Sequence, residues 1–398
     1  MATKQTSRAK GARGPTGEQR SYRRVVAKFG TALLTSGTSS LDTKMMAALA
    51  KQVAHLRADG VEVIVVSSGA IAAGRERLGL GDERRDIPFR QVLASVGQSH
   101  LMQTYDRLFA GHGIVVGQTL LTRRDLSDRL GYLNARNTLL ALVDAGAVPI
   151  VNENDVVAVE EIEGALIGDN DNLSALVANL VDADLLAILT DTGGLHTADP
   201  RRDPDATLVE RVERITPEIE RLADDSGTPH GVGGMITKLQ AAKLATAGGA
   251  NVVIANGHER DALERLAGGD ALERLVKGET IGTLFPAASD RVESRKRWML
   301  AGLSARGKIV VDAGAAKALT AQGKSLLPAG VRDVTGPFER GDAVSICEEQ
   351  GRRIAIGITN YGHEDASAIR GVRSDRIEEL LGHEYGAELV HRNNLVVL

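Results

Sequence analysis

The sequence predicts an α/β protein, with a doubly wound, mainly parallel sheet sandwiched by helices and a small β-barrel-like module after it. Between Val25 and Phe285, short apolar runs rich in β-branched residues alternate with longer patterns of helical period, as in chains that form parallel sheets. Beyond Pro286 the runs become short, β-rich and separated by glycine-containing turns. The chain has 398 residues, more than one ordinary hydrophobic core accommodates, so we expect at least two domains.

The composition shifts along the chain predict four segments. They are a basic tail at residues 1–24, an α/β domain at 25–285, a linker at 286–294 and the C-terminal module at 295–398. The tail is rich in lysine and arginine, has Glu18 as its single acid, and lacks an apolar core of the signal-peptide kind. We expect it to be disordered; an organelle transit segment is the alternative.

The composition disfavours several classes of protein. Aromatic residues make up 3% of the chain and the formal net charge is −4, so neither a base-stacking surface nor a general attraction to nucleic acid or anionic membrane is expected. The single cysteine, Cys347, excludes an internal disulfide and agrees with a reducing compartment. No apolar run approaches the roughly 18 residues of a membrane-spanning helix. We therefore expect a cytoplasmic protein that does not interact with membranes.

The first part of the α/β domain contains three predicted strands and three predicted helices. In chain order these are strand Val25–Phe29, helix Leu41–Asp59, strand Val61–Val66, a helix that includes Ile71–Gly74, helix Gln91–Phe109 and strand Ile114–Val116. Gly117-Gln118 and Thr122–Asp125 are predicted to form a polar connection after the third strand.

The second part of the chain continues the alternation and then changes to strands. The α/β domain is completed by helix Leu133–Val143, strand Val148–Val151, a helix over Leu173–Leu180, strand Leu185–Leu189, a helix following Lys238, strand Val252–Ala255 and a closing run Ile281–Phe285. Three strands are predicted in the C-terminal module, namely Lys308–Val311, Ala343–Cys347 and Ile354–Ile358.

Two polar clusters flank one strand–loop–helix unit near the middle of the chain. Asn152–Asp155 follows a buried strand, and Gly168–Asn172 precedes a helix. Strand ends and helix starts are where open α/β sheets hold ligands. Amides can donate to a carboxylate and carboxylates can accept from an ammonium, so the mixture suits an amino-acid zwitterion. The alternative is that these residues serve only as turn and N-cap residues.

Lysine, glycine and small residues mark three further strand-to-helix connections. Lys28-Phe29-Gly30-Thr31 places an ammonium beside backbone N–H groups, and Ser67–Gly74 leaves room for a ligand at a turn. Gly231–Lys238 combines a glycine-rich loop with a lysine near a helix start, a combination suited to phosphate. A surface lysine, tight helix–strand packing and an ordinary loop are the respective structural alternatives.

Taken in chain order, these motifs resemble the amino acid kinase family over Val25–Phe285. The residues that carry the resemblance are Val26–Thr31, Ser67–Gly74, Asn152–Asp155, Gly168–Ala175, Thr190-Asp191 and Gly233–Lys238, with Gln98, Leu133–Arg136 and Thr197–Pro200 in agreement. Ser325–Gly330 and Val334–Gly336 look like parts of the PUA domain that follows the kinase domain in some members.

Within the family, the match implies ATP-dependent phosphorylation of the side-chain carboxylate of L-glutamate to L-glutamyl 5-phosphate, the first step of proline biosynthesis. Phosphoryl transfer depends on positioning and charge neutralisation more than on covalent work by the protein. The resemblance implies that Lys28 and Lys238 supply the cations and that Asp171 orients them. The attacking carboxylate is already ionised at neutral pH, so no strong general base is needed.

The resemblance also implies the residues that bind each substrate. Glutamate contacts are expected from Ser68, Asp155 and Asn170, with Asn152 and Asp169 nearby. Nucleotide contacts are expected from Lys28, Thr190, Asp191, Val232, Gly233, Gly234, Met235, Ile236, Thr237 and Lys238. Mg²⁺ would accompany ATP and be held mainly by phosphates and water, so we name no protein ligand for it.

Further partners follow from the same resemblance. It implies feedback inhibition by proline, a homo-oligomer and an association with glutamyl phosphate reductase. One alternative is a kinase for another carboxylate, carbamate or a nucleoside monophosphate, which the amide–acid loop and the C-terminal module disfavour. RNA binding by the PUA-like module is a second alternative, disfavoured by its balanced charge and by the few aromatics. In a third, the module serves oligomerisation or regulation.

Overall fold

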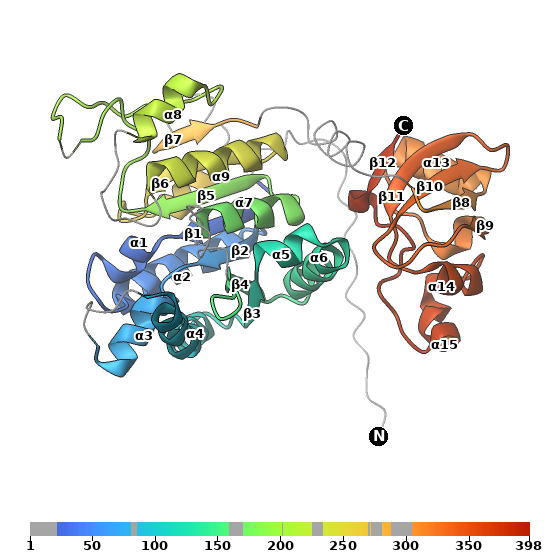
Figure 1. The fold of residues 1–398 in the computed structure, drawn as a ribbon, viewed down its shortest axis with the longest axis horizontal. Coiled ribbons are helices and arrows are strands. Elements are labelled where there is room, and N and C mark those ends of the chain that lie inside the picture. The colour runs from blue at the N-terminus through green and yellow to red at the C-terminus, as the bar shows by residue number, and fades with distance from the viewer. Residues whose placement is uncertain are drawn as a thin grey trace.

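The computed structural model describes residues 22–80, 86–158, 170–200, 202–224, 234–269, 271, 281–287 and 305–398. In these residues the strands form two sheets, one of seven strands and one of five, which lie in separate parts of the molecule (Figure 1). No helix within the described ranges is long and apolar enough to cross a membrane.

The larger sheet is built from the first part of the chain. Its strands are β1 (Arg24–Phe29), β2 (Glu62–Ser67), β3 (Val116–Leu121), β4 (Val148–Glu153), β5 (Leu185–Thr190), β6 (Asn251–Asn256) and β7 (Thr283–Phe285). Their order is β3-β4-β2-β1-β5-β6-β7, and β7 alone among these strands is antiparallel to its neighbour. The order runs outward from β1 in both directions, which confirms the predicted doubly wound, mainly parallel sheet.

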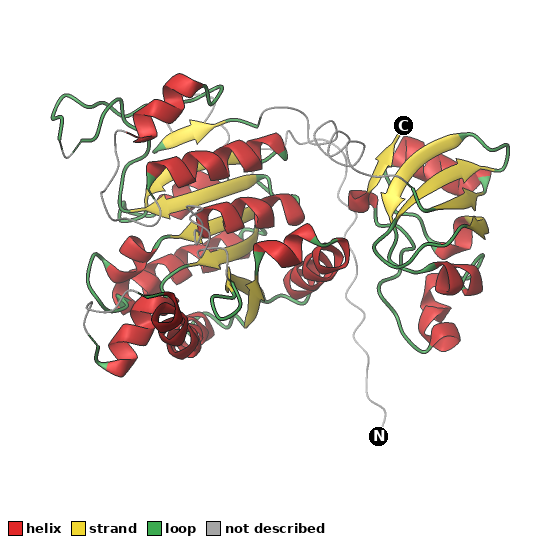
Figure 2. Ribbon diagram, in the orientation of Figure 1, coloured by secondary structure: helices red, strands yellow, loops and turns green. Residues whose placement is uncertain are grey.

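Helices cover both faces of this sheet (Figure 2). One face packs against α1 (Thr31–Thr35), α2 (Thr43–Ala58), α3 (Ala70–Leu78), α4 (Ile87–Ala110) and α10 (Ala262–Ala267). The other packs against α5 (Arg123–Ser127), α6 (Arg129–Asp144), α7 (Asn170–Leu180), α8 (Pro217–Asp224) and α9 (Met235–Ala247). Along β1, Val25, Ala27 and Phe29 belong to the first core cluster and Val26 belongs to the second. This alternation is the two-residue period of a strand buried on both sides.

Most predicted elements agree with the structure apart from their ends, but those after Ile114 do not. The strand predicted at Ile114–Val116 shares only Val116 with β3, and Arg123–Asp125, predicted as part of a connection, lie in α5. Gly117-Gln118, predicted as a connection, lies within β3. That prediction was wrong because β3 is an edge strand, bonded to β4 alone and only partly buried, so its sequence is less apolar than that of the central strands. Asn152 and Glu153 continue β4, and Asn170–Asn172 form the first turn of α7. In β4 these polar residues follow the apolar pattern, and in α7 they precede it. The apolar pattern therefore marks only part of each element.

The described residues begin slightly before the predicted boundary of the α/β domain. Tyr22 is buried and Arg24 begins β1, so these residues belong to the folded domain and not to the predicted tail at 1–24. Residues 1–21 of that tail lie outside the described residues, as does the predicted linker from residue 288 on.

The C-terminal region forms a second sheet, as predicted. Its strands are β8 (Gly307–Val311), β9 (Val331–Thr335), β10 (Ala343–Glu348), β11 (Arg353–Ile358) and β12 (Leu395–Val397), accompanied by helices α13 (Ala313–Gln322), α14 (His363–Ala368) and α15 (Ile377–Leu381). The strand order is β12-β11-β10-β8-β9, in which the β8–β10 pair is parallel and the other pairs are antiparallel. The buried side chains of this region form a core cluster of their own.

Helix α6 of the α/β domain contacts the C-terminal sheet. Its Leu133 is fully buried in a small apolar cluster with Ala343, Ile356, Ile358 and Val396 of the C-terminal sheet. At the start of the same helix, Arg129 forms an ion pair of 3.7 Å with Asp342. The C-terminal sheet therefore packs on the helix that precedes β4, the strand ending in Asn152-Glu153.

Candidate active site

The candidate site lies where the central strands of the larger sheet end. Strands β2, β1 and β5 are neighbours and run parallel, so their carboxyl ends meet at one edge. The chain leaves β1 toward α1 and α2 on one face, whereas it enters β5 from α7 on the other. Such a change of face is where doubly wound sheets open a crevice for ligands.

Two lysines from distant parts of the sequence contact one carboxylate at this edge. Lys28 Nζ lies 2.5 Å from Asp171 Oδ1, and Lys238 Nζ lies 3.1 Å from Asp171 Oδ2. All three side chains are buried: Lys28 is 4% exposed, Lys238 6% and Asp171 0%. The hydroxyl of Thr237 lies 3.1 Å from Asp171 Oδ2 and 2.8 Å from the carbonyl oxygen of Gly234. The predicted lysine pair and its orienting acid are thus in direct contact.

Strand period and helix position explain why these residues meet. Lys28 lies two residues after Val26 on β1, so its side chain points to the face covered by α7 and α9. Asp171 lies in the first turn of α7 and Lys238 in the first turn of α9. All three charged side chains therefore extend from regular elements, namely β1, α7 and α9.

Charge balance sets the ionisation of this cluster. Burial by itself raises the pKa of the Asp171 carboxyl, but the charges and hydrogen bonds of Lys28 and Lys238 outweigh it and hold that pKa well below its ordinary value. Asp171 is therefore ionised at neutral pH and is shared by two ammonium groups. These two groups, with the partial positive charge at the start of α9, favour an anionic ligand at this place.

Next to the lysine pair, four polar side chains form a hydrogen-bonded chain. Asn170 Nδ2 donates to Ser68 Oγ (3.1 Å) and to Asn152 Oδ1 (3.0 Å). Asn152 Nδ2 donates to Gln98 Oε1 (2.8 Å). Asn170 precedes Asp171 directly, so the amide chain and the lysine pair share the start of α7.

Two buried atoms of this amide chain have no protein partner among the described residues, namely the amide nitrogen of Gln98 and the amide oxygen of Asn170. Buried polar groups are normally hydrogen-bonded, and one left unpaired commonly marks a site for a ligand or water. One atom is a donor and the other an acceptor, so the pair matches a ligand that carries both a carboxylate and an ammonium.

The turn after β2 shapes the serine end of the amide chain. Gly69 has a φ of +98°, a conformation that residues with a Cβ rarely adopt. This turn ends β2 at Ser67 and leads into α3 immediately after Ser68. Ser67 Oγ lies 2.8 Å from the hydroxyl of buried Tyr105, which fixes the strand end beneath Ser68.

The other predicted nucleotide residues that the structure describes lie at the carboxyl end of β5 and at the start of α9. Thr190 is buried and its hydroxyl donates to Asp191 Oδ1 (3.0 Å), while Asp191 itself is exposed. Gly234 is the N-cap residue of α9, and Met235 and Ile236 begin that helix. Among the described residues, no atom lies within 4 Å of a Cβ placed on Gly234.

Not every predicted residue joins these groups in the structure. Asp155 lies just beyond β4, in the turn over residues 155–157, and is partly exposed. Asp169, Val232 and Gly233 lie outside the described residues, so their assignments stay predictions. Sequence reasoning gave no role to Gln98, which completes the amide chain from the middle of α4. A glutamine within an otherwise amphipathic helix gives only a weak signal in a single sequence.

Comparison with known proteins identifies two families and several similar proteins. Residues 23–256 match the model of the amino acid kinase family, and residues 307–381 match that of the PUA domain. The chain is 54% identical to a glutamate 5-kinase of Dehalococcoides mccartyi over 95% of this chain and 99% of that protein. It is 50% identical to the glutamate 5-kinase of Herpetosiphon aurantiacus, over 94% of this chain and 98% of that protein. With the glutamate 5-kinase of Ralstonia nicotianae it shares 50% identity over 94% and 97% of the two chains.

Proposed function

The chain belongs to the amino acid kinase family, and on that premise we propose that it is a glutamate 5-kinase carrying a PUA domain. The reaction transfers the terminal phosphoryl group of ATP to the side-chain carboxylate of L-glutamate. Its products are ADP and L-glutamyl 5-phosphate, and it is the first step of proline biosynthesis.

The contact of Lys28 and Lys238 with one carboxylate is the observation that carries this proposal. A transferring phosphoryl group carries charge on its outer oxygens, and preorganised cations lower the barrier by stabilising that charge. The two ammonium groups are buried, so little water screens them. Asp171 acts as a positioning residue, since it holds both ammonium groups and has both of its oxygens engaged by them.

The amide chain is the proposed site of L-glutamate. Asn170, Asn152, Ser68 and Gln98 offer donors and acceptors next to the lysine pair. A substrate bound there presents its side-chain carboxylate to a phosphoryl group held by the lysines. That carboxylate is ionised at neutral pH, so the attack requires alignment and no proton abstraction.

ATP is the second substrate, and we place its phosphates between the lysine pair and the start of α9. Mg²⁺ would accompany ATP and neutralise part of the phosphate charge. Among the described residues, no group of three or more histidine, cysteine, aspartate or glutamate side chains could hold a metal ion, and Asp171 is engaged by two lysines. We therefore assign no protein ligand to the metal, whose ligands would be phosphates and water.

Several further properties stay predictions. They are the domain boundaries at 25–285 and 295–398, a homo-oligomeric state, inhibition by proline, association with glutamyl phosphate reductase and a cytoplasmic location. Truncation after residue 294 addresses the role of the PUA domain directly. If the truncated protein keeps its catalytic activity but loses proline inhibition, a regulatory role is supported. If it keeps its activity but changes its number of subunits, an assembly role is supported.

The proposed activity is tested by incubating the purified protein with L-glutamate, ATP and MgCl₂ and trapping the acyl phosphate with hydroxylamine. Hydroxamate formation that depends on glutamate and is matched by ADP release is the expected result. Parallel reactions with aspartate, carbamate and uridine monophosphate identify the acceptor. Phosphorylation of one of these in place of glutamate would contradict the proposal.

A further inference from the structure

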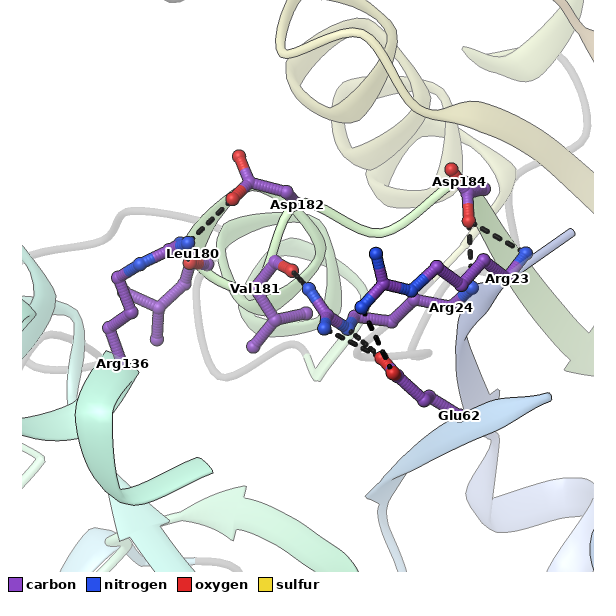
Figure 3. Close-up of polar contacts among 8 residues, drawn as sticks. All are labelled: Arg23, Arg24, Glu62, Arg136, Leu180, Val181, Asp182 and Asp184. Carbon is purple, nitrogen blue, oxygen red and sulfur yellow. Dashed lines mark hydrogen bonds and ion pairs between the residues drawn. The ribbon is translucent and has the colours of Figure 1, made fainter. Parts of the chain in front are cut away.

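The end of helix α7 opposite to Asp171 is held by two arginines (Figure 3). Arg136 of α6 donates to the carbonyl oxygen of Leu180, and Arg24 of β1 donates to that of Val181. Carbonyl groups at a helix carboxyl end lack partners within the helix and carry partial negative charge, so guanidinium groups stabilise them. Arg136 is 1% exposed, which makes it the more deeply buried of the two.

Each guanidinium is also paired with a carboxylate. Arg136 lies 2.6 Å from Asp182 Oδ2, and Arg24 lies 2.6 Å from Glu62 Oε2 of the neighbouring strand β2. A buried charge is costly unless it is paired and hydrogen-bonded, so these pairs keep both arginines in place.

Arg24 and Lys28 lie on the same strand and contact opposite ends of the same helix. Four residues of strand span about 13 Å, and the ten residues from Asp171 to Val181 span about 15 Å of helix. The similar lengths let β1 contact α7 at both ends, through Arg24 at Val181 and through Lys28 at Asp171. The position of Asp171 along the helix axis is therefore tied to the contact at the far end.

Backbone strain at the end of α7 is a third observation. Asp182 has a φ of +52°, a left-handed conformation usually taken by glycine after a helix. Aspartate adopts this conformation more readily than most residues with a Cβ, but less readily than glycine. Glycine would lack a side chain, whereas the Asp182 carboxylate pairs with Arg136. The left-handed residue therefore helps to hold Arg136 at the end of α7.

We propose that Arg136 and Arg24 are positioning residues for phosphoryl transfer. They fix the carboxyl end of α7, so that Asp171 at its amino end holds the ammonium groups of Lys28 and Lys238 in reacting position. This inference rests on the proposed function, because it assigns those lysines to the transferring phosphoryl group. Both arginines bond to backbone carbonyl groups at the end of α7 opposite to Asp171, so their effect on the reaction passes through the helix.

The test compares Arg136→Ala, Arg24→Ala and Arg136→Lys with the wild-type chain in the hydroxamate assay at saturating substrates. Misplacement of reacting groups by about 1 Å can cost on the order of 10²-fold in rate. We expect kcat to fall by about 10–100-fold in both alanine variants, while KM for ATP and for glutamate changes by less than about threefold. Arg136→Lys keeps a charge and a donor, and should recover part of kcat.

Leu49→Ala is the matched control for lost stability. Leu49 is 1% exposed and lies in α2, on the sheet face opposite to α7. It should lower the unfolding temperature as much as the arginine variants do and leave kcat unchanged. Wild-type kcat in both alanine variants, or a fall no larger than that of Leu49→Ala, would overturn the proposal.

Two measurements keep the test decisive if a variant folds poorly or the substrate is wrong. Asp182→Asn removes only the charge beside Arg136 and should also lower kcat with KM retained; unchanged kcat in this variant counts against the anchor. Hydrogen exchange of the first turn of α7 needs no substrate, and it should be faster in Arg136→Ala than in Leu49→Ala. Equal exchange in the two variants refutes the proposal that the arginines fix α7. A wild-type chain that makes no acyl phosphate refutes the proposed function instead.

Discussion

Lys28 of β1 and Lys238 of α9 contact different oxygens of a single carboxylate, that of Asp171, at 2.5 and 3.1 Å. Both lysines are almost fully buried, so the contact fixes two positive charges in a site that water screens poorly. Two ammonium groups thus share one carboxylate beside the amide chain. In the function that we propose, these groups stabilise the phosphoryl group next to the bound amino acid.

Removing either lysine should slow the reaction with little effect on substrate binding. We expect Lys28→Ala and Lys238→Ala each to lower kcat by about 10²–10³-fold, the usual loss of one charge-stabilising donor. Lys243→Ala is the control, since Lys243 lies on the same helix as Lys238 but is exposed and paired with Glu220. Steady-state kinetics with purified variants gives the answer, and undiminished kcat in both variants would remove the lysines from the mechanism.

Replacing Asp171 by asparagine should cost stability in a pH-dependent way. Two buried ammonium groups would lose their counter-charge, which costs about 3–5 kcal/mol for a buried pair. Because the folded pKa of Asp171 is lowered from 3.8, its contribution is fully present above the unfolded value and is lost as the pH falls through the folded value.

Urea unfolding of the wild-type chain and Asp171→Asn from pH 7 down to about pH 3 measures this contribution. The difference in unfolding free energy should stay constant down to about pH 5 and shrink below about pH 4. Asp59→Asn, at an exposed helix end, should change the stability by less than about 0.5 kcal/mol throughout. A difference that grows as the pH falls would show that Asp171 is not the ionised partner.

Gln98 should influence glutamate affinity and not ATP affinity. In Gln98→Leu, Asn152 Nδ2 loses its acceptor and the ligand loses a buried donor, so KM for glutamate should rise on the order of tenfold while KM for ATP stays constant. Gln52→Leu is the control, because Gln52 is also buried but accepts from Leu263 N on the other side of the domain. Equal effects on the two KM values would place Gln98 outside the glutamate site.

Gly69 and Gly79 form a pair of substitutions that separates backbone strain from function. Both have positive φ, +98° and +63°, and neither would bring a Cβ closer than 3.5 Å to another atom. Alanine at either position should therefore destabilise the fold by about 1–2 kcal/mol through strain alone. Only Gly69→Ala should raise KM for glutamate, because only Gly69 follows Ser68. Matching kinetics in the two variants would argue against Ser68 as a substrate contact.

Much of the fold could be predicted because the central strands are buried on both faces. Val61–Val66, apolar except for Glu62, and the continuous apolar run Leu185–Leu189 coincide with β2 and β5 to within one residue at each end. Strand β3 was misplaced because an edge strand needs no such run. Polar residues at element ends, such as Asn152 and Asn170, were predicted to form a site and were assigned to loops, whereas they lie in β4 and α7.

The candidate site could be predicted only in part, because its contacts join distant segments. The family motif indicated Lys28, Asp171 and Lys238, but only the fold shows that one carboxylate contacts both lysines. Arg136 lies in a recognised motif without an apparent role, and its partners Leu180 and Asp182 come from another helix end. Single-sequence patterns report period and propensity, and neither identifies a partner far along the chain.

A structure of the protein with L-glutamate, ADP, Mg²⁺ and aluminium fluoride as a mimic of the transferring phosphoryl group tests the central claim most directly. We expect Nζ of Lys28 and Nζ of Lys238 to lie within about 3.2 Å of the mimic or of the phosphate oxygens next to it, with Asp171 still between them. A mimic bound at a distance from both nitrogens, or on the other side of the glutamate from them, would contradict the account.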